Sequence, residues 1–114
     1  NLEKIDDYAF FLFLLLDKIK LPDTVKYIGD GAFSECVALM DISLGNGVTH
    51  IGSQAFASCW KLRYITLPAS VETTGDGLFS SCSYLRLITI KKPQGSLDTS
   101  NWGIGFNVKW KPEE

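Results

Sequence analysis

Three cysteines, Cys36, Cys59 and Cys82, lie 23 residues apart, and most of the residues around them repeat at the same interval. The further sets that share the interval are Phe33, Phe56 and Phe79; Gly29, Gly52 and Gly75; Val25, Val48 and Val71; and Leu21, Leu44, Leu67 and Ile90. A fixed period between about 20 and 50 residues is typical of stacked supersecondary units. The chain is therefore predicted to be a solenoid, a fold whose rows of equivalent side chains suit binding better than catalysis.

The period divides residues 1–90 into four predicted coils, which cover residues 1–20, 21–43, 44–66 and 67–90. The first coil is degenerate but keeps apolar residues at Ile5, Ala9, Phe10, Leu16 and Ile19. One coil buries about six apolar side chains at roughly 1.5–3 kcal/mol each, whereas ordering each backbone residue costs roughly 1–2 kcal/mol. A single coil is not expected to fold alone, but stacked coils share their cores.

Each coil is expected to contain two extended stretches and one tighter segment. The alternation of Ile65 and Leu67 predicts a short strand with one face inward. Residues 48–51 predict a second extended stretch that ends at a glycine. Residues 55–59 are expected to carry apolar side chains inward from a helical or 3₁₀ segment.

The repeat Leu-Pro-x-x-Val-x-x-Ile-Gly-x-x-Ala-Phe-x-x-Cys-x-x-Leu-x-x-Ile-x resembles the BspA-like leucine-rich repeat, also called the Treponema pallidum type. The resemblance covers residues 5–90 and departs from the pattern at Asp6, Gly45, Thr74 and Leu78. It implies a leucine-rich-repeat solenoid of the kind found in bacterial or protist surface proteins that serve adhesion and protein recognition. It therefore also implies a secreted or cell-surface location.

Composition argues against several other classes of protein. Eleven Lys and Arg against thirteen Asp and Glu give a net charge of −2, so a nucleic acid or anionic-membrane partner is not expected. The apolar run at residues 8–16 is far shorter than the roughly 20 residues of a spanning helix, so this segment is not expected to be transmembrane. Asp6 and Asp7 stand where a signal peptide carries positive charge, and the chain is expected to be a mature or excised segment.

The cysteines and the single histidine were considered as chemical groups. Stacked coils lie about 4.8 Å apart and hold equivalent thiols parallel, which suits neither disulfide geometry nor four converging zinc ligands. Buried free thiols are the preferred interpretation. His50 has no partner implied by spacing and is expected at the surface. No catalytic residue, metal site or cofactor is predicted, and an enzyme is not expected.

The candidate binding residues flank the inward isoleucine of each main strand. In leucine-rich repeats generally this row forms a concave contact face, and Tyr and Arg are enriched at binding hot spots. The predicted binding residues are Lys18, Lys20, Met40, Asp41, Arg63, Tyr64, Thr66, Arg86, Leu87 and Thr89. An ordinary solvated sheet face is the alternative.

A second candidate surface is apolar. Phe11, Leu12, Leu14 and Leu15 stand where the second coil has smaller or polar residues. Such a patch indicates an interface. Three explanations remain open: a neighbouring N-terminal domain, another copy of the chain, or folding of the run over the open end of the first coil.

Residues 91–114 depart from the repeat and carry several aromatic residues, among them Trp102, Phe106 and Trp110. The last coil of a solenoid exposes its core and a strand edge, so this segment is predicted to be a capping flank. A carbohydrate-stacking platform is the rival interpretation. For the whole chain we expect a non-catalytic surface module that binds a protein or a glycan, with a structural spacer in a longer adhesin as the alternative.

Overall fold

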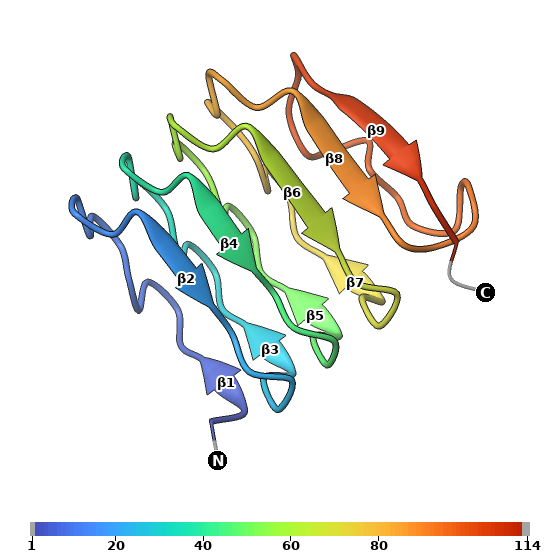
Figure 1. Ribbon diagram of the computed structural model, residues 1–114, viewed down its shortest axis with the longest axis horizontal. Coiled ribbons are helices and arrows are strands. Elements are labelled where there is room, and N and C mark those ends of the chain that lie inside the picture. The colour runs from blue at the N-terminus through green and yellow to red at the C-terminus, as the bar shows by residue number, and fades with distance from the viewer. Residues whose placement is uncertain (1, 113–114) are drawn as a thin grey trace.

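Residues 2–112 are described by a computed structural model and form a parallel β-solenoid of about five turns (Figure 1). The prediction of a mainly-β solenoid with coils of 23 residues is confirmed. The number of turns exceeds the predicted four, because the residues after position 90 continue the stack.

The shorter strands form one continuous sheet, which we call the back sheet. Its four parallel strands are, in order, β1 (Lys4–Ile5), β3 (Tyr27–Ile28), β5 (His50–Ile51) and β7 (Thr73–Thr74). Ile5 pairs with Ile28, and Ile28 pairs with Ile51. Paired residues in neighbouring back strands are therefore one 23-residue period apart.

The longer strands form the second row seen in Figure 1. They are β2 (Lys18–Lys20), β4 (Asp41–Ser43), β6 (Tyr64–Leu67), β8 (Leu87–Ile90) and β9 (Asn107–Trp110). β2 pairs with β4, and β6, β8 and β9 form a second parallel sheet, but no strand pairing joins β4 to β6 within residues 2–112. We call the outward surface of this row the strand face.

The segments that follow the back strands are successions of turns, and residues 2–112 contain no helix. The expectation of a helical or 3₁₀ segment at residues 55–59 is therefore wrong. Gln54 and Ser58 have φ of 57° and 58°, which places a left-handed residue on each side of Phe56 and prevents a continuous helix. Gln54 N–H and Ser58 N–H donate instead to carbonyls of the next coil, with N···O distances of 2.9 and 2.7 Å.

The core is a column of equivalent aromatic rings. Phe10, Phe33, Phe56 and Phe79 stack with centroid distances of 5.1, 5.6 and 5.7 Å and interplanar angles of at most 11°. Phe33, Phe56 and Phe79 are almost completely buried, whereas Phe10 is partly exposed at the first coil. Stacking of this column is what allows coils that cannot fold singly to share one core.

The tail was expected to leave the period, but Trp102 continues the aromatic column one period after Phe79. Its ring meets Phe79 edge to face at a centroid distance of 5.6 Å, and its indole N–H donates to Thr74 Oγ1 at 3.0 Å. Gly103 and Gly105, between Trp102 and β9, have positive φ angles of 127° and 92°.

The last coil is shorter than the others. Leu87 of β8 pairs with Asn107 of β9, three residues earlier than the period requires. The division into an array at 1–90 and a capping flank at 91–114 stays a prediction, and its outer limits, residues 1 and 113–114, lie outside the described residues. Within residues 2–112, no helix is long and apolar enough to cross a membrane.

Candidate binding face

The structure places the predicted binding residues along the strand face. Seven of them lie in strands. In one sheet Lys18 pairs with Asp41, and Lys20 pairs with Ser43, which is not one of the predicted residues. In the other sheet Tyr64 pairs with Leu87, and Thr66 pairs with Thr89. Met40, Arg63 and Arg86 immediately precede β4, β6 and β8 and are exposed. Leu87 and Thr89 are only partly exposed.

Three of these residues meet in one hollow of about 520 Å³, which we call the rim hollow. It is lined by Met40, Lys61, Arg63, Tyr64 and Tyr84. Both tyrosines and Met40 are more than half exposed, at 60%, 56% and 55%. The candidates on β2 and β8 do not line this hollow.

Sequence reasoning missed Lys61 and Tyr84, which lie in the turns before β6 and β8. They occupy one repeat position, since they are separated by one period. The two earlier residues at this position, Leu15 and Ala38, are apolar. A change from apolar to large polar residues along this row is the signal that could have identified them.

The cations at the rim hollow have no carboxylate partner among residues 2–112. In residues 2–112 the single salt bridge joins Lys4 to Asp6 at 4.0 Å, far along the chain from Lys61 and Arg63. Arg86 N–H donates to Arg63 O at 2.8 Å, so these arginines stand in neighbouring coils at a spacing of about 4.8 Å. Lys61 and Arg63 thus line the hollow beside two phenol rings with no carboxylate among its lining residues, Arg86 follows in the next coil, and Asp41 lies in an adjoining hollow.

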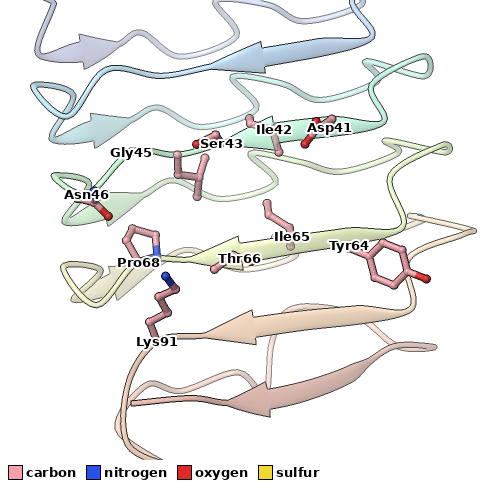
Figure 2. Close-up of a pocket in the computed structure, with 11 residues that line it drawn as sticks. Asp41, Ile42, Ser43, Gly45, Asn46, Tyr64, Ile65, Thr66, Pro68 and Lys91 are labelled. Atoms are coloured by element: carbon pink, nitrogen blue, oxygen red, sulfur yellow. The ribbon is translucent and has the colours of Figure 1, made fainter. Parts of the chain in front are cut away.

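A second hollow of about 430 Å³ lies between β4 and β6, and we call it the strand cleft. Figure 2 shows Asp41 and Tyr64 near one end and Asn46, Pro68 and Lys91 at the other. Tyr64 lines both the strand cleft and the rim hollow. The two hollows are therefore neighbours that share one side chain.

The strand cleft exists because the hydrogen-bonding pattern is interrupted. Met40 N–H donates to Asp17 O at 2.8 Å, and Arg86 N–H donates to Arg63 O at the same distance. The equivalent bond from Arg63 N–H to Met40 O is missing from the described part of the chain. Backbone groups on the facing edges of β4 and β6 are consequently left open.

The loop after β4 differs from the equivalent loops of the neighbouring coils. Gly45 replaces the proline found at positions 22 and 68 and has a φ of 72°. Asn46 N–H donates to Asp23 Oδ1 at 2.9 Å, and a side chain at Gly47 would clash with the carbonyl oxygen of Asp23. The loop is thus held against the preceding coil.

The apolar patch of the first coil remains uncovered. Phe11, Leu12, Leu14 and Leu15 are exposed by 39%, 48%, 54% and 95%. The run therefore does not bury itself over the open end of its own coil, and that explanation is wrong. A neighbouring domain and a second copy stay open as predictions.

The three cysteines are buried and free. Each thiol donates to a phenylalanine carbonyl of the preceding coil: Cys36 Sγ to Phe10 O at 3.0 Å, Cys59 Sγ to Phe33 O at 3.2 Å, and Cys82 Sγ to Phe56 O at 3.0 Å. Burial raises the pKa of all three thiols, to about 11 for Cys82. Such thiols are poor nucleophiles near neutral pH.

His50 lies on the outer side of the back sheet, where it is half-buried. Its ring stacks on Tyr27 at a centroid distance of 4.6 Å, and its Nδ1 hydrogen-bonds to Thr73 Oγ1. No group of three or more His, Cys, Asp or Glu residues in positions 2–112 is arranged to hold a metal ion. The stacking and the hydrogen bond to Thr73 account for His50 structurally.

This geometry defines the class of protein: a parallel leucine-rich-repeat solenoid with an exposed strand face. The chain belongs to the family described as the BspA-type leucine-rich repeat region, whose model matches residues 3–101 in six copies. None of the curated proteins is significantly similar to this chain.

Solved structures show the same relationship. A leucine-rich cell-surface protein of Faecalibacterium prausnitzii is 28% identical with a TM-score of 0.77, and the match covers 97% of this chain and 30% of that one. The pneumococcal vaccine antigen PcpA is 36% identical with a TM-score of 0.75, over 83% of this chain and 23% of that antigen. A leucine-rich repeat protein of Bacteroides capillosus is 29% identical with a TM-score of 0.64, over 95% and 62% of the two chains. The chain thus spans less than a third of the first two relatives.

Proposed function

We propose that this chain is a non-catalytic recognition module of a bacterial cell-surface or secreted protein, and that it binds partner proteins through the strand face. The relatives support the location, since one is described as a cell-surface protein and another as a vaccine antigen. The family supports the absence of catalysis, because leucine-rich-repeat surface proteins are generally non-catalytic.

The observation that carries the proposal is the composition of the rim hollow. Two exposed tyrosines stand next to Arg63, which has no salt bridge within residues 2–112, and Tyr and Arg are the residue types found at binding hot spots. Trp102 is only 1% exposed, so the proposed carbohydrate platform of the tail lacks its first indole ring. These two features favour a protein ligand at the strand face over a glycan at the tail.

The test is surface plasmon resonance of the immobilised chain against a panel of purified extracellular-matrix proteins and glycans. We expect Arg63→Ala, Tyr64→Ala and Arg86→Ala together to abolish binding, with little change in melting temperature because all three side chains are exposed. The matched control carries Lys26→Ala and Glu72→Ala on the opposite side of the coils and should bind normally. Undiminished binding by the triple variant would sink the strand-face assignment.

A structural spacer is the second candidate. It is favoured by the small share of the relatives that this chain covers, since binding residues can lie in the remainder of such proteins. A spacer predicts that the isolated wild-type chain binds no member of the panel.

A further inference from the structure

We propose that the rim hollow binds an acidic peptide segment of a partner protein, in extended conformation. The proposal rests on the proposed function above and names the chemistry of its ligand. It assigns the peptide carboxylates to Lys61, Arg63 and Arg86, and the apolar peptide side chains to the two tyrosines and Met40.

The positive side chains of the rim hollow favour a negatively charged ligand. Lys61 and Arg63 line the hollow, no carboxylate lines it, and neither side chain is in a salt bridge within residues 2–112. Arg86 adds a third cation in the next coil. A ligand that brings carboxylates gains charge-assisted hydrogen bonds, and the guanidinium group can hold a carboxylate in two parallel bonds.

The apolar surface of the rim hollow indicates which kind of ligand side chain lies beside the carboxylate. Tyr64, Tyr84 and Met40 expose more than half of their surface around the same hollow. Tyrosine supplies a large contact area at a small entropic cost because it has few rotatable bonds. The hollow is therefore suited to a carboxylate next to an apolar side chain.

The pair of hollows favours a peptide over an acidic polysaccharide. The rim hollow and the strand cleft are separate depressions that share Tyr64. An extended peptide presents every second side chain to one side, at intervals of about 6.6 Å, so alternate residues can enter neighbouring hollows.

The experiment measures fluorescence anisotropy of a labelled short peptide in which two glutamates alternate with two leucines, so that each face of the extended chain carries both residue types. Its counterpart has glutamine in place of every glutamate, and a labelled hyaluronan oligosaccharide represents an acidic glycan. We expect the glutamate peptide to bind, the glutamine peptide to bind at least about tenfold more weakly, and binding to weaken as salt rises above about 0.15 M.

Charge reversal locates the site. Lys61→Glu with Arg63→Glu should reduce affinity for the glutamate peptide at least about tenfold. The matched control is Lys4→Glu with Lys26→Glu, which makes the same charge change at exposed residues on the back-sheet side of the coils, outside both hollows. Lys61→Gln with Arg63→Gln repeats the test should the reversed pair fail to fold.

Equal weakening by both charge-reversal pairs would show general attraction and overturn the proposal. Equal binding of the glutamine peptide, binding of hyaluronan alone, or binding of no probe would overturn it too. If a panel protein still binds through Arg63, Tyr64 and Arg86 while the glutamate peptide does not, the proposed function stands and only the acidic-peptide inference falls.

Discussion

Cys36, Cys59 and Cys82 do more than fill space in the core. Each thiol donates a hydrogen bond to the preceding coil, at Sγ···O distances between 3.0 and 3.2 Å. A small apolar residue such as alanine would fit the position but would leave the phenylalanine carbonyl with one donor fewer. The cysteine of the motif is thus explained by burial together with weak donation between coils.

The raised pKa of Cys82 predicts a loss of stability at alkaline pH. Its folded pKa of about 11 exceeds the ordinary value of 9.0, so the protonated thiol stabilises the fold fully below pH 9. As pH rises from 9 towards 11, deprotonation of the unfolded chain removes that stability at about 1.4 kcal/mol per pH unit.

Urea unfolding between pH 8 and pH 10.5 checks this expectation. Cys82→Ala should unfold more easily at pH 8 but should lose less stability than the wild type above pH 9. Tyrosines and lysines titrate in both proteins, so the difference isolates the thiol. Parallel pH profiles for the two proteins would contradict the prediction.

At the scale of elements, the interruption between β4 and β6 is the main departure from a uniform stack. The back sheet runs unbroken through β1, β3, β5 and β7, whereas the front row is divided. Strand pairing is therefore interrupted on one side of the coils only. The strand cleft is the result, and it lies beside the hollow that carries the proposed ligand.

Amide hydrogen exchange tests this division at three equivalent positions, Asp41, Tyr64 and Leu87. Asp41 N–H and Leu87 N–H each donate to the preceding coil at 3.3 Å, whereas Tyr64 N–H has no such bond to Met40 in the described chain. We expect the protection factor of Tyr64 to be at least about tenfold lower than that of the other two. Fraying from the N-terminus would instead give protection that rises steadily from Asp41 to Leu87.

At the scale of the whole molecule, exposed apolar residues gather at the first coil. Leu14 and Leu15 are exposed by 54% and 95%, next to the unpaired edge of β2. Exposed apolar clusters of this kind mark interaction surfaces. We expect the chain to self-associate through this end when no other domain covers it.

Sedimentation equilibrium of Leu14→Ser with Leu15→Ser checks this expectation. The association constant should fall at least about tenfold, because a hydroxyl group replaces buried apolar surface in the complex. The melting temperature of the monomer should hardly change, since both side chains are exposed. Ile104→Ser, which alters an equally exposed residue in the last coil, is the control; a strictly monomeric wild type would rule out self-association.

The fold could be predicted from the sequence because the residues that recur every 23 positions are the ones that face the core. Ile28, Phe33 and Leu39 are fully buried, as their periodicity indicates. Trp102 also follows the period, but the three residues missing before β9 concealed the fifth turn. A period identifies equivalent positions well and insertions or deletions poorly.

The candidate site was predicted in part, for a related reason. Periodicity placed Arg63 and Tyr64 on the strand face, but the partners Lys61 and Tyr84 belong to a turn whose residues differ from coil to coil. The strand cleft could not be predicted, because it lies where backbone pairing between β4 and β6 is missing, and the repeat motif gives no sign of that interruption. A repeat motif describes what the coils share, whereas recognition depends on where they differ.

The three buried cysteines can also report which coil of the chain opens first. One buried cysteine stands in each of three successive coils, in nearly the same chemical setting. A thiol becomes open to an alkylating reagent only when its coil separates from its neighbours. Mass spectrometry of the alkylated peptides would therefore show which coil opens first, without introducing any label.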